Sequence, residues 1–176
     1  AAYGVKVLFD EGMIRRFLPD DKWDSIIYTA IAHHSDYELP EISDPQTLLH
    51  AKLIRDEDKL DNCRVKLVDS TSTFINVSEE ELGTQNITQK VYETVFKNKC
   101  ILSADRVTQM DYWVSYIVYF FDINFKESFD IIAENDYLNR IIDRIPYSNP
   151  STKKQMKKIR TYMQKFINSH TGSRLS

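Results

Sequence analysis

The sequence predicts an all-α fold. Its 176 residues include only 4 Gly and 5 Pro, which is few for a protein built from many strands and tight turns. Apolar residues recur at intervals of three and four, and no segment alternates convincingly with period two. The length allows a sizeable core. Hydrophobic residues at 42% and charged residues at 28% are typical of globular chains, which excludes wholesale disorder.

Charge and hydropathy narrow the classes of partner. The net charge of -3 argues against nucleic acid as a bulk electrostatic partner. The longest apolar run, residues 112–121, is far shorter than the roughly 18 residues of a membrane span, so we expect a buried helix there and no membrane partner. Cys63 and Cys100 form no disulfide framework. Two buried thiols and a reduced, cytoplasmic setting are expected.

The N-terminal region predicts two helices. The first covers residues 5–17, and its apolar side chains at helical spacing are Val5, Leu8, Phe9 and Met13. The run PDD at residues 19–21 stops this helix and caps a second one over residues 23–34. The apolar face of the second helix is the clearest in the chain, and its members are Trp23, Ile26, Ile27, Ala30, Ile31 and His34.

A third helix is predicted to begin at Pro45, because Ser43 and Asp44 supply capping side chains directly ahead of a first-turn proline. It runs towards Leu67, and its apolar positions include Leu48, Leu49, Leu53, Ile54 and Leu60. The polar run DSTST at residues 69–73 breaks the pattern, so a linker or lid is expected over residues 70–85.

Helical spacing continues to the end of the chain. Ser78 and Glu81 resemble a capping box. The apolar faces that follow are Ile87, Val91 and Val95; Trp113, Tyr116, Ile117, Phe120 and Phe121; Ile132, Leu138, Ile141 and Ile142; and Met156, Ile159, Met163 and Phe166. We interpret the face that begins at Trp113 as core rather than a partner surface. The basic residues at 153–160 are interpreted as the solvated side of the last helix.

Two positions carry candidate chemistry. His34 lies on the apolar face of its helix, where a histidine is either a satisfied core residue or a ligand. Asp58 lies in the charged run RDEDKLDN at residues 55–62, and Ile54 places it on a partly apolar face, whereas Glu57 faces solvent. An inward carboxylate needs a metal, a cation or hydrogen-bond donors to offset its desolvation. A histidine and a carboxylate from two helices form half of a typical metal site.

Four stretches resemble the HD-domain metal-dependent phosphohydrolases. Residues 30–34 read AIAHH and residues 49–61 read LHAKLIRDEDKLD, in which the string R-D-x-D-K-L-D is the most specific piece. Residues 4–17 and 121–126 are similar to stretches of one bacterial subgroup of that family. The resemblance therefore covers nearly the whole chain and implies the C-terminal portion of an HD-type helical bundle with additional helices.

In that family a His, an adjacent His-Asp pair and a distant Asp hold a divalent metal ion, and a further His often lines the site. The resemblance implies that Asp58 is the distant metal ligand. It implies that His34 lines the site and binds a second metal ion or the phosphate, or orients the attacking water in catalysis. Asn62 matches an Asn that contacts substrate in the related alarmone hydrolases. Arg55 and Lys59 are candidates either for phosphate contact or for ion pairs within the helix.

The sequence departs from the family at its best-known motifs. The four histidines are His33, His34, His50 and His170, and none is followed by Asp. The first His and the His-Asp pair are expected upstream of Ala1, so we interpret the chain, which starts without Met, as the C-terminal part of a longer enzyme. The other interpretation is a degenerate relative without activity. Residues 1–69 would belong to the HD core and residues 86–176 to a C-terminal helical extension.

The expected function is metal-dependent hydrolysis of a phosphate ester, with a nucleotide as the candidate substrate. The alternative is a catalytically inactive, HD-like module that binds a nucleotide or regulates another protein. A third possibility is a purely structural helical interaction domain. The oligomeric state has no signature in the sequence.

Overall fold

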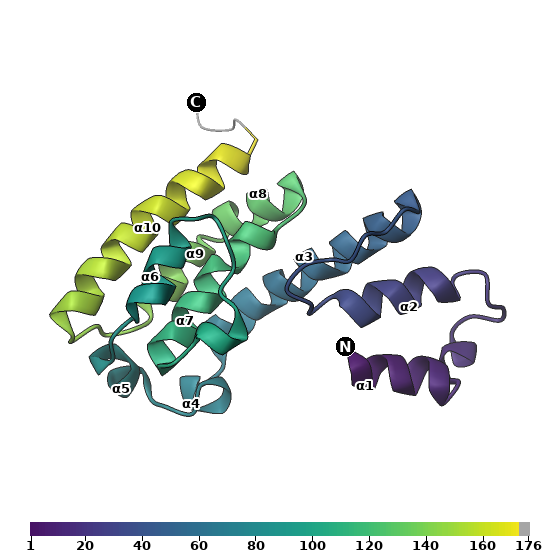
Figure 1. The fold of residues 1–176 in the computed structure, drawn as a ribbon, viewed down its shortest axis with the longest axis horizontal. Helices are drawn as coiled ribbons and strands as arrows, with labels where there is room; N and C mark the ends of the chain where they lie inside the picture. Colours follow the sequence, from purple (N-terminus) through teal and green to yellow (C-terminus); the bar gives the residue numbers. More distant parts are fainter. Residues whose placement is uncertain (173–176) are drawn as a thin grey trace. The chain divides into compact units, whose positions relative to one another are not determined.

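The computed structural model describes residues 1–172, and every regular element in that range is helical (Figure 1). The all-α prediction is confirmed. The chain divides into two compact units, Ala1–Asp58 and Lys59–Ser176. Helix α3, Pro45–Val68, contributes residues to both units. Within the described range, no helix combines the length and the hydropathy needed to cross a bilayer.

The N-terminal unit is built from short helical segments and two longer helices. It starts with α1, Ala2–Val5, a π-helical turn η1, Lys6–Asp10, and a 3-10 turn η2, Met13–Arg16. The prediction of one continuous helix over residues 5–17 is wrong, because Gly12 adopts a left-handed backbone with φ 72° and interrupts it. Helix α2, Asp24–His33, agrees with the second predicted helix to within one residue at each end.

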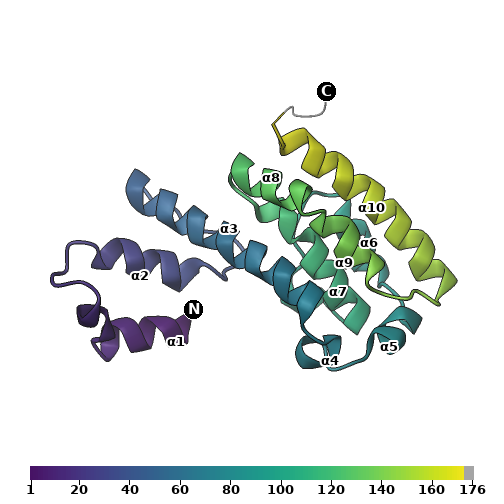
Figure 2. The ribbon, with the colours of Figure 1, turned by 180° about the vertical axis from the view of Figure 1, so that it is seen from behind.

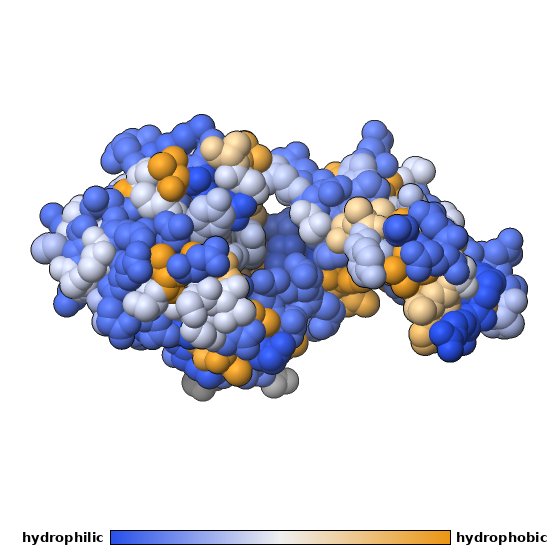
Figure 3. Space-filling model, turned by 90° about the horizontal axis from the view of Figure 1, so that it is seen from below, coloured by the Kyte–Doolittle hydropathy of each residue, from blue (hydrophilic) through white to orange (hydrophobic). Residues whose placement is uncertain are grey.

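The buried core of the N-terminal unit is small. Among residues 1–58, all of which the structure describes, the buried hydrophobic residues are Ile14, Ala30 and Ala51. The predicted apolar face of α2 is instead one wall of a groove of about 430 Å³ between α2 and α3, lined by Trp23, Ile26, Ile27, Ala30, Ile31, His50, Leu53, Ile54 and Glu57. Figure 3 shows hydrophobic patches bordered by hydrophilic residues on the surfaces of both units.

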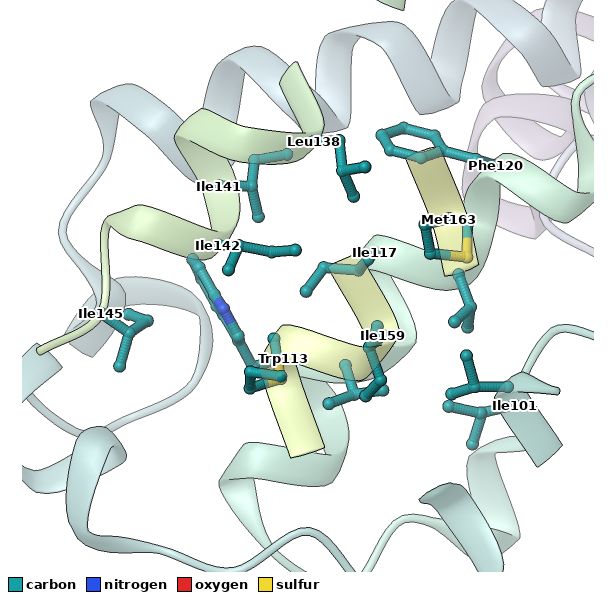
Figure 4. Packing of buried hydrophobic residues seen from close by; sticks show 14 of the residues in the cluster. Ile101, Trp113, Ile117, Phe120, Leu138, Ile141, Ile142, Ile145, Ile159 and Met163 are labelled. Carbon is teal, nitrogen blue, oxygen red and sulfur yellow. The ribbon is translucent and has the colours of Figure 1, made fainter. Parts of the chain in front are cut away.

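The C-terminal unit holds most of the core. After the end of α3 come α4, Thr71–Phe74; α5, Glu79–Thr84; α6, Gln89–Val95; η3, Ser103–Asp105; α7, Gln109–Ile117; η4, Val118–Asp122; α8, Lys126–Glu134; α9, Tyr137–Asp143; and α10, Pro150–His170. Helix α10 packs along α8 and α9, and α7 packs on α9 (Figure 2). Trp113, Ile117, Ile142, Ile159 and Met163 gather where α7, α9 and α10 meet (Figure 4).

The predicted inward faces of this unit are confirmed. Trp113, Ile117 and Phe120 are at most 1% exposed, which makes the aromatic face of α7 core rather than a partner surface. On α10, Met156, Ile159 and Met163 are buried, and the neighbouring lysines at 153, 154, 157 and 158 are exposed. The 21-residue helix α10 therefore has one buried face and one solvated, basic face.

The segment expected as a linker or lid, residues 70–85, contains α4 and α5 and packs into the C-terminal unit. Ile75 and Leu82 belong to the core. The polar residues of this segment satisfy local backbone groups: Thr71 Oγ1 donates to the Val77 carbonyl at 2.9 Å, and Ser78 Oγ accepts from the Glu81 amide at 3.2 Å. The expected boundaries at 69 and 86 also differ from the division between Asp58 and Lys59.

Candidate metal and phosphate site

His34 follows the last residue of α2 and is half-buried. Its Nδ1 lies 2.7 Å from the backbone carbonyl of Ile31. A carbonyl oxygen can only accept a hydrogen bond, so Nδ1 carries a proton and donates it. In the neutral ring Nε2 then keeps its lone pair, which is the tautomer that a metal ligand or a general base needs.

Arg55 connects α3 to the end of α2. Arg55 is 1% exposed, and its Nη1 donates to the carbonyls of His33 at 2.9 Å and Asp36 at 2.8 Å. Longer bonds run from Nη1 to the His34 carbonyl at 3.4 Å and from Nη2 to the Tyr37 carbonyl at 3.5 Å. The last carbonyls of a helix have no partner within it, and a cation complements the negative end of its dipole. Arg55 thus caps α2 and fixes the backbone that carries His34.

Asp58 lies three residues after Arg55 on α3 and is half-buried. Residues three apart on a helix are neighbours on its surface, so Asp58 projects from the side of α3 on which Arg55 meets the end of α2. Glu57 is exposed, as expected, whereas Asp56 is fully buried and was not singled out by the sequence.

Lys59 and Asn62 belong to the C-terminal unit. The Lys59 ammonium is 8% exposed and pairs with Asp122 Oδ2 of η4 at 2.7 Å. Lys59 therefore forms an ion pair that joins α3 to η4. Asn62 is half-buried on the next turn of α3, and its contact with substrate stays a prediction.

Sequence reasoning missed that the buried side of α3 is rich in charge. Arg55, Asp56, Lys59 and Lys66 are all less than 9% exposed. The Lys66 ammonium lies 4.0 Å from the ring centre of Phe74 and 4.1 Å from that of Tyr116, an arrangement that stabilises a cation. A signal was present: Ala51, Arg55, Lys59, Cys63 and Lys66 recur at intervals of four and three.

The two cysteines differ in burial. Cys63 lies in the core, and burial raises the pKa of its thiol to about 12, which keeps it protonated at neutral pH. Cys100 is half-buried, and its Sγ lies 3.5 Å from the Val118 carbonyl. Among the described residues, neither cysteine forms a disulfide. The expected buried thiol is confirmed for Cys63.

Residues 1–172 contain no group of three or more His, Cys, Asp or Glu side chains placed to hold one metal ion. His34 and Asp58 offer two donors of the classes that bind borderline divalent ions, an imidazole nitrogen and a carboxylate. Two donors are fewer than a stable site of protein ligands alone requires. No protein-family model matches the chain, and neither the curated proteins nor the solved structures include a significant match.

Proposed function

We propose that the chain forms part of an HD-type, metal-dependent phosphohydrolase, in which His34 and Asp58 face the divalent metal ion and the phosphate. One observation carries this proposal: Arg55 bonds the backbone at His33 and His34 to α3, three residues before Asp58. That contact supports a His and an Asp from separate helices converging on one place. The fixed Nδ1 hydrogen of His34 supports a ligand role for its Nε2.

Each side chain has a defined task in this proposal. Asp58 supplies a carboxylate to the metal ion, and His34 supplies Nε2 either to a second ion or to a water molecule beside the phosphate. The chemistry that a bound divalent ion supplies is activation of water and polarisation of a phosphoryl oxygen. Arg55 is a positioning residue, because its guanidinium is buried among backbone carbonyls.

A second candidate is a module that binds a nucleotide or regulates a partner without hydrolysing anything. One observation favours it: both cations offered for phosphate contact have protein partners. Arg55 bonds to the carbonyls after α2, and Lys59 pairs with Asp122. Under this candidate the phosphate would be held without turnover.

Calorimetric titration with Mn²⁺, followed by an assay with p-nitrophenyl phosphate, tests the proposal. D58N and H34Q should each weaken Mn²⁺ binding about tenfold, because each removes one of a few donors. Hydrolysis that requires Mn²⁺ and is lost in both variants supports the enzyme. Mn²⁺ binding that depends on both residues, with no turnover of the ester, supports the non-catalytic candidate.

Matched controls lie beside each site residue. His33 pairs with Asp36 at 2.6 Å, and Asp61 pairs with Arg64 at 2.8 Å on the surface of α3. H33Q and D61N should leave Mn²⁺ affinity unchanged. If the controls weaken binding as much as D58N and H34Q do, the ion binds by general surface charge and the proposed site is wrong.

A further inference from the structure

A second cavity lies entirely within the C-terminal unit. It measures about 450 Å³ and is bordered by α9, the connection after it and the first half of α10. Ile142 and Met156 form an apolar part of its wall. Tyr147, Lys153, Lys157 and Arg160 form the polar part. A volume in this range is typical of sites for small molecules.

Two buried donors of this wall have no acceptor among the described residues: Arg160 Nε and the hydroxyl hydrogen of Tyr147. The indole N–H of Trp113 faces the oxygen of the Tyr147 hydroxyl and leaves the hydroxyl hydrogen available. Burial, the largest influence, raises the pKa of Tyr147, so its hydroxyl keeps the proton and can donate. A buried donor left unpaired costs about 1–3 kcal/mol, and an acceptor in the cavity would remove that cost.

The cavity is also positively charged. Three cations, Lys153, Lys157 and Arg160, face one carboxylate, that of Asp143. Arg160 Nη1 lies 3.3 Å from Asp143 Oδ2, and Nη2 pairs with the other oxygen. For Lys153 and Lys157 the described part of the chain offers no carboxylate within 4.0 Å. An anion in the cavity therefore meets two ammonium groups that no acidic side chain neutralises.

We propose that this cavity binds a small phosphate monoester, with the phosphate at Lys153, Lys157, Arg160 Nε and the Tyr147 hydroxyl. The apolar body of the ester would lie on Ile142 and Met156. A dianionic phosphate matches the two unpaired ammonium groups, and its oxygens accept from all four donors. This binding site lies in a different unit from His34 and Asp58 and does not depend on the function proposed for them.

Phenyl phosphate is the probe, titrated in EDTA so that no metal-dependent hydrolysis occurs. The readout is the ¹H–¹⁵N correlation spectrum, in which the two tryptophans give two indole signals and W23F assigns that of Trp113. We expect a saturable shift of the Trp113 indole signal, because that indole adjoins Tyr147. Inorganic phosphate, which lacks the apolar body, should bind about tenfold more weakly.

The matched variants exchange two lysines for glutamine on the same helix. K153Q/K157Q should weaken phenyl phosphate binding at least about tenfold, because it removes both unpaired cations. K154Q/K158Q removes two exposed charges that do not border the cavity and should change the affinity less than about twofold. Equal losses in both variants, or no saturation, would overturn the site. Equal affinity for inorganic phosphate and phenyl phosphate would show that the cavity does not select a phosphate ester.

Discussion

Arg55 Nη1 lies 2.9 Å from the backbone carbonyl of His33, and this bond joins the middle of α3 to the last residue of α2. The same nitrogen bonds to the carbonyl of Asp36 beyond the helix end. Arg144 makes a similar cap at the end of α3: its Nη1 bonds to the carbonyl of Lys66, and Nη2 to that of Asp69 at 2.6 Å. In both places a distant arginine satisfies carbonyls that the helix leaves unpaired.

Removing the Arg55 cap should lower the free energy of unfolding. R55M removes the buried guanidinium that donates to the carbonyls of His33 and Asp36, and it should lower the free energy of unfolding by about 3 kcal/mol. R55K keeps the positive charge but loses the planar guanidinium with its several N–H donors, so it should also destabilise the protein. Urea denaturation followed by circular dichroism measures both. R64M, which removes the exposed partner of Asp61, should leave the midpoint unchanged; an equal loss there would mean that the cap is not responsible.

The Lys59–Asp122 pair should matter for stability more than for ligand binding. D122A removes the carboxylate that lies 2.7 Å from the Lys59 ammonium, and it should lower the free energy of unfolding by about 3 kcal/mol. K59M, which removes the buried charge itself, should cost less. Thermal denaturation of both variants checks this order. A larger cost for K59M than for D122A would contradict it.

Gly83 should tolerate no side chain. A Cβ there would clash with the backbone oxygen of Pro146, and the Gly83 carbonyl accepts from the amides of both Ser148 and Asn149 at 3.1 Å. G83A should therefore lower stability by about 1–3 kcal/mol through overpacking. G4A is the control, since its Cβ would meet only Ile31 Cγ2 at 3.5 Å. The idea fails if G83A and G4A unfold at the same urea concentration.

The cap at the start of α3 should make stability fall in acid. Asp44 Oδ2 accepts from the Thr47 hydroxyl at 2.6 Å and the Thr47 amide at 2.7 Å, and these bonds lower the pKa of Asp44 below 3.8. The folded pKa is the lower one, so the stabilisation is complete above 3.8 and is lost as pH falls through the folded pKa.

The test compares melting temperatures of the wild type, D44N and D44A from neutral to acid pH. Asn also caps helices, so D44N should keep most of the stability at pH 7, whereas D44A should lose it. The difference in melting temperature between the wild type and D44A should shrink as pH falls below about 4. A D44A variant as stable as the wild type at pH 7 would show that the cap contributes nothing.

Helix boundaries that are set by neighbouring residues in the sequence could be predicted from it. Ser43, Asp44 and Pro45 located the start of α3, and the helix runs to Val68 as its apolar spacing indicated. The first helix was predicted wrongly because Gly12 is a single residue within an otherwise helical pattern. The segment expected as a linker or lid was judged by its polar composition, but Thr71 and Ser78 use their hydroxyls on nearby backbone groups.

The partners of the charged residues on α3 could not be predicted from the sequence. Arg55 bonds to carbonyls after another helix, and Lys59 pairs with Asp122, far along the chain. Such contacts depend on packing between elements rather than on spacing within one helix. The predicted roles of His34 and Asp58 rest on the resemblance together with the Arg55 contact, and the metal site stays a proposal.

The central claim is that His34 and Asp58 lie together at one divalent-metal site. Paramagnetic broadening by Mn²⁺ in the ¹H–¹⁵N correlation spectrum tests it most directly, because even weak binding broadens signals near the ion. We predict that the amide signals around His34 and Asp58 broaden together at the lowest Mn²⁺ concentration, and that D58N and H34Q each raise the Mn²⁺ concentration needed for this broadening about tenfold. Broadening that begins elsewhere, or that needs the same Mn²⁺ concentration in both variants as in the wild type, would contradict the claim.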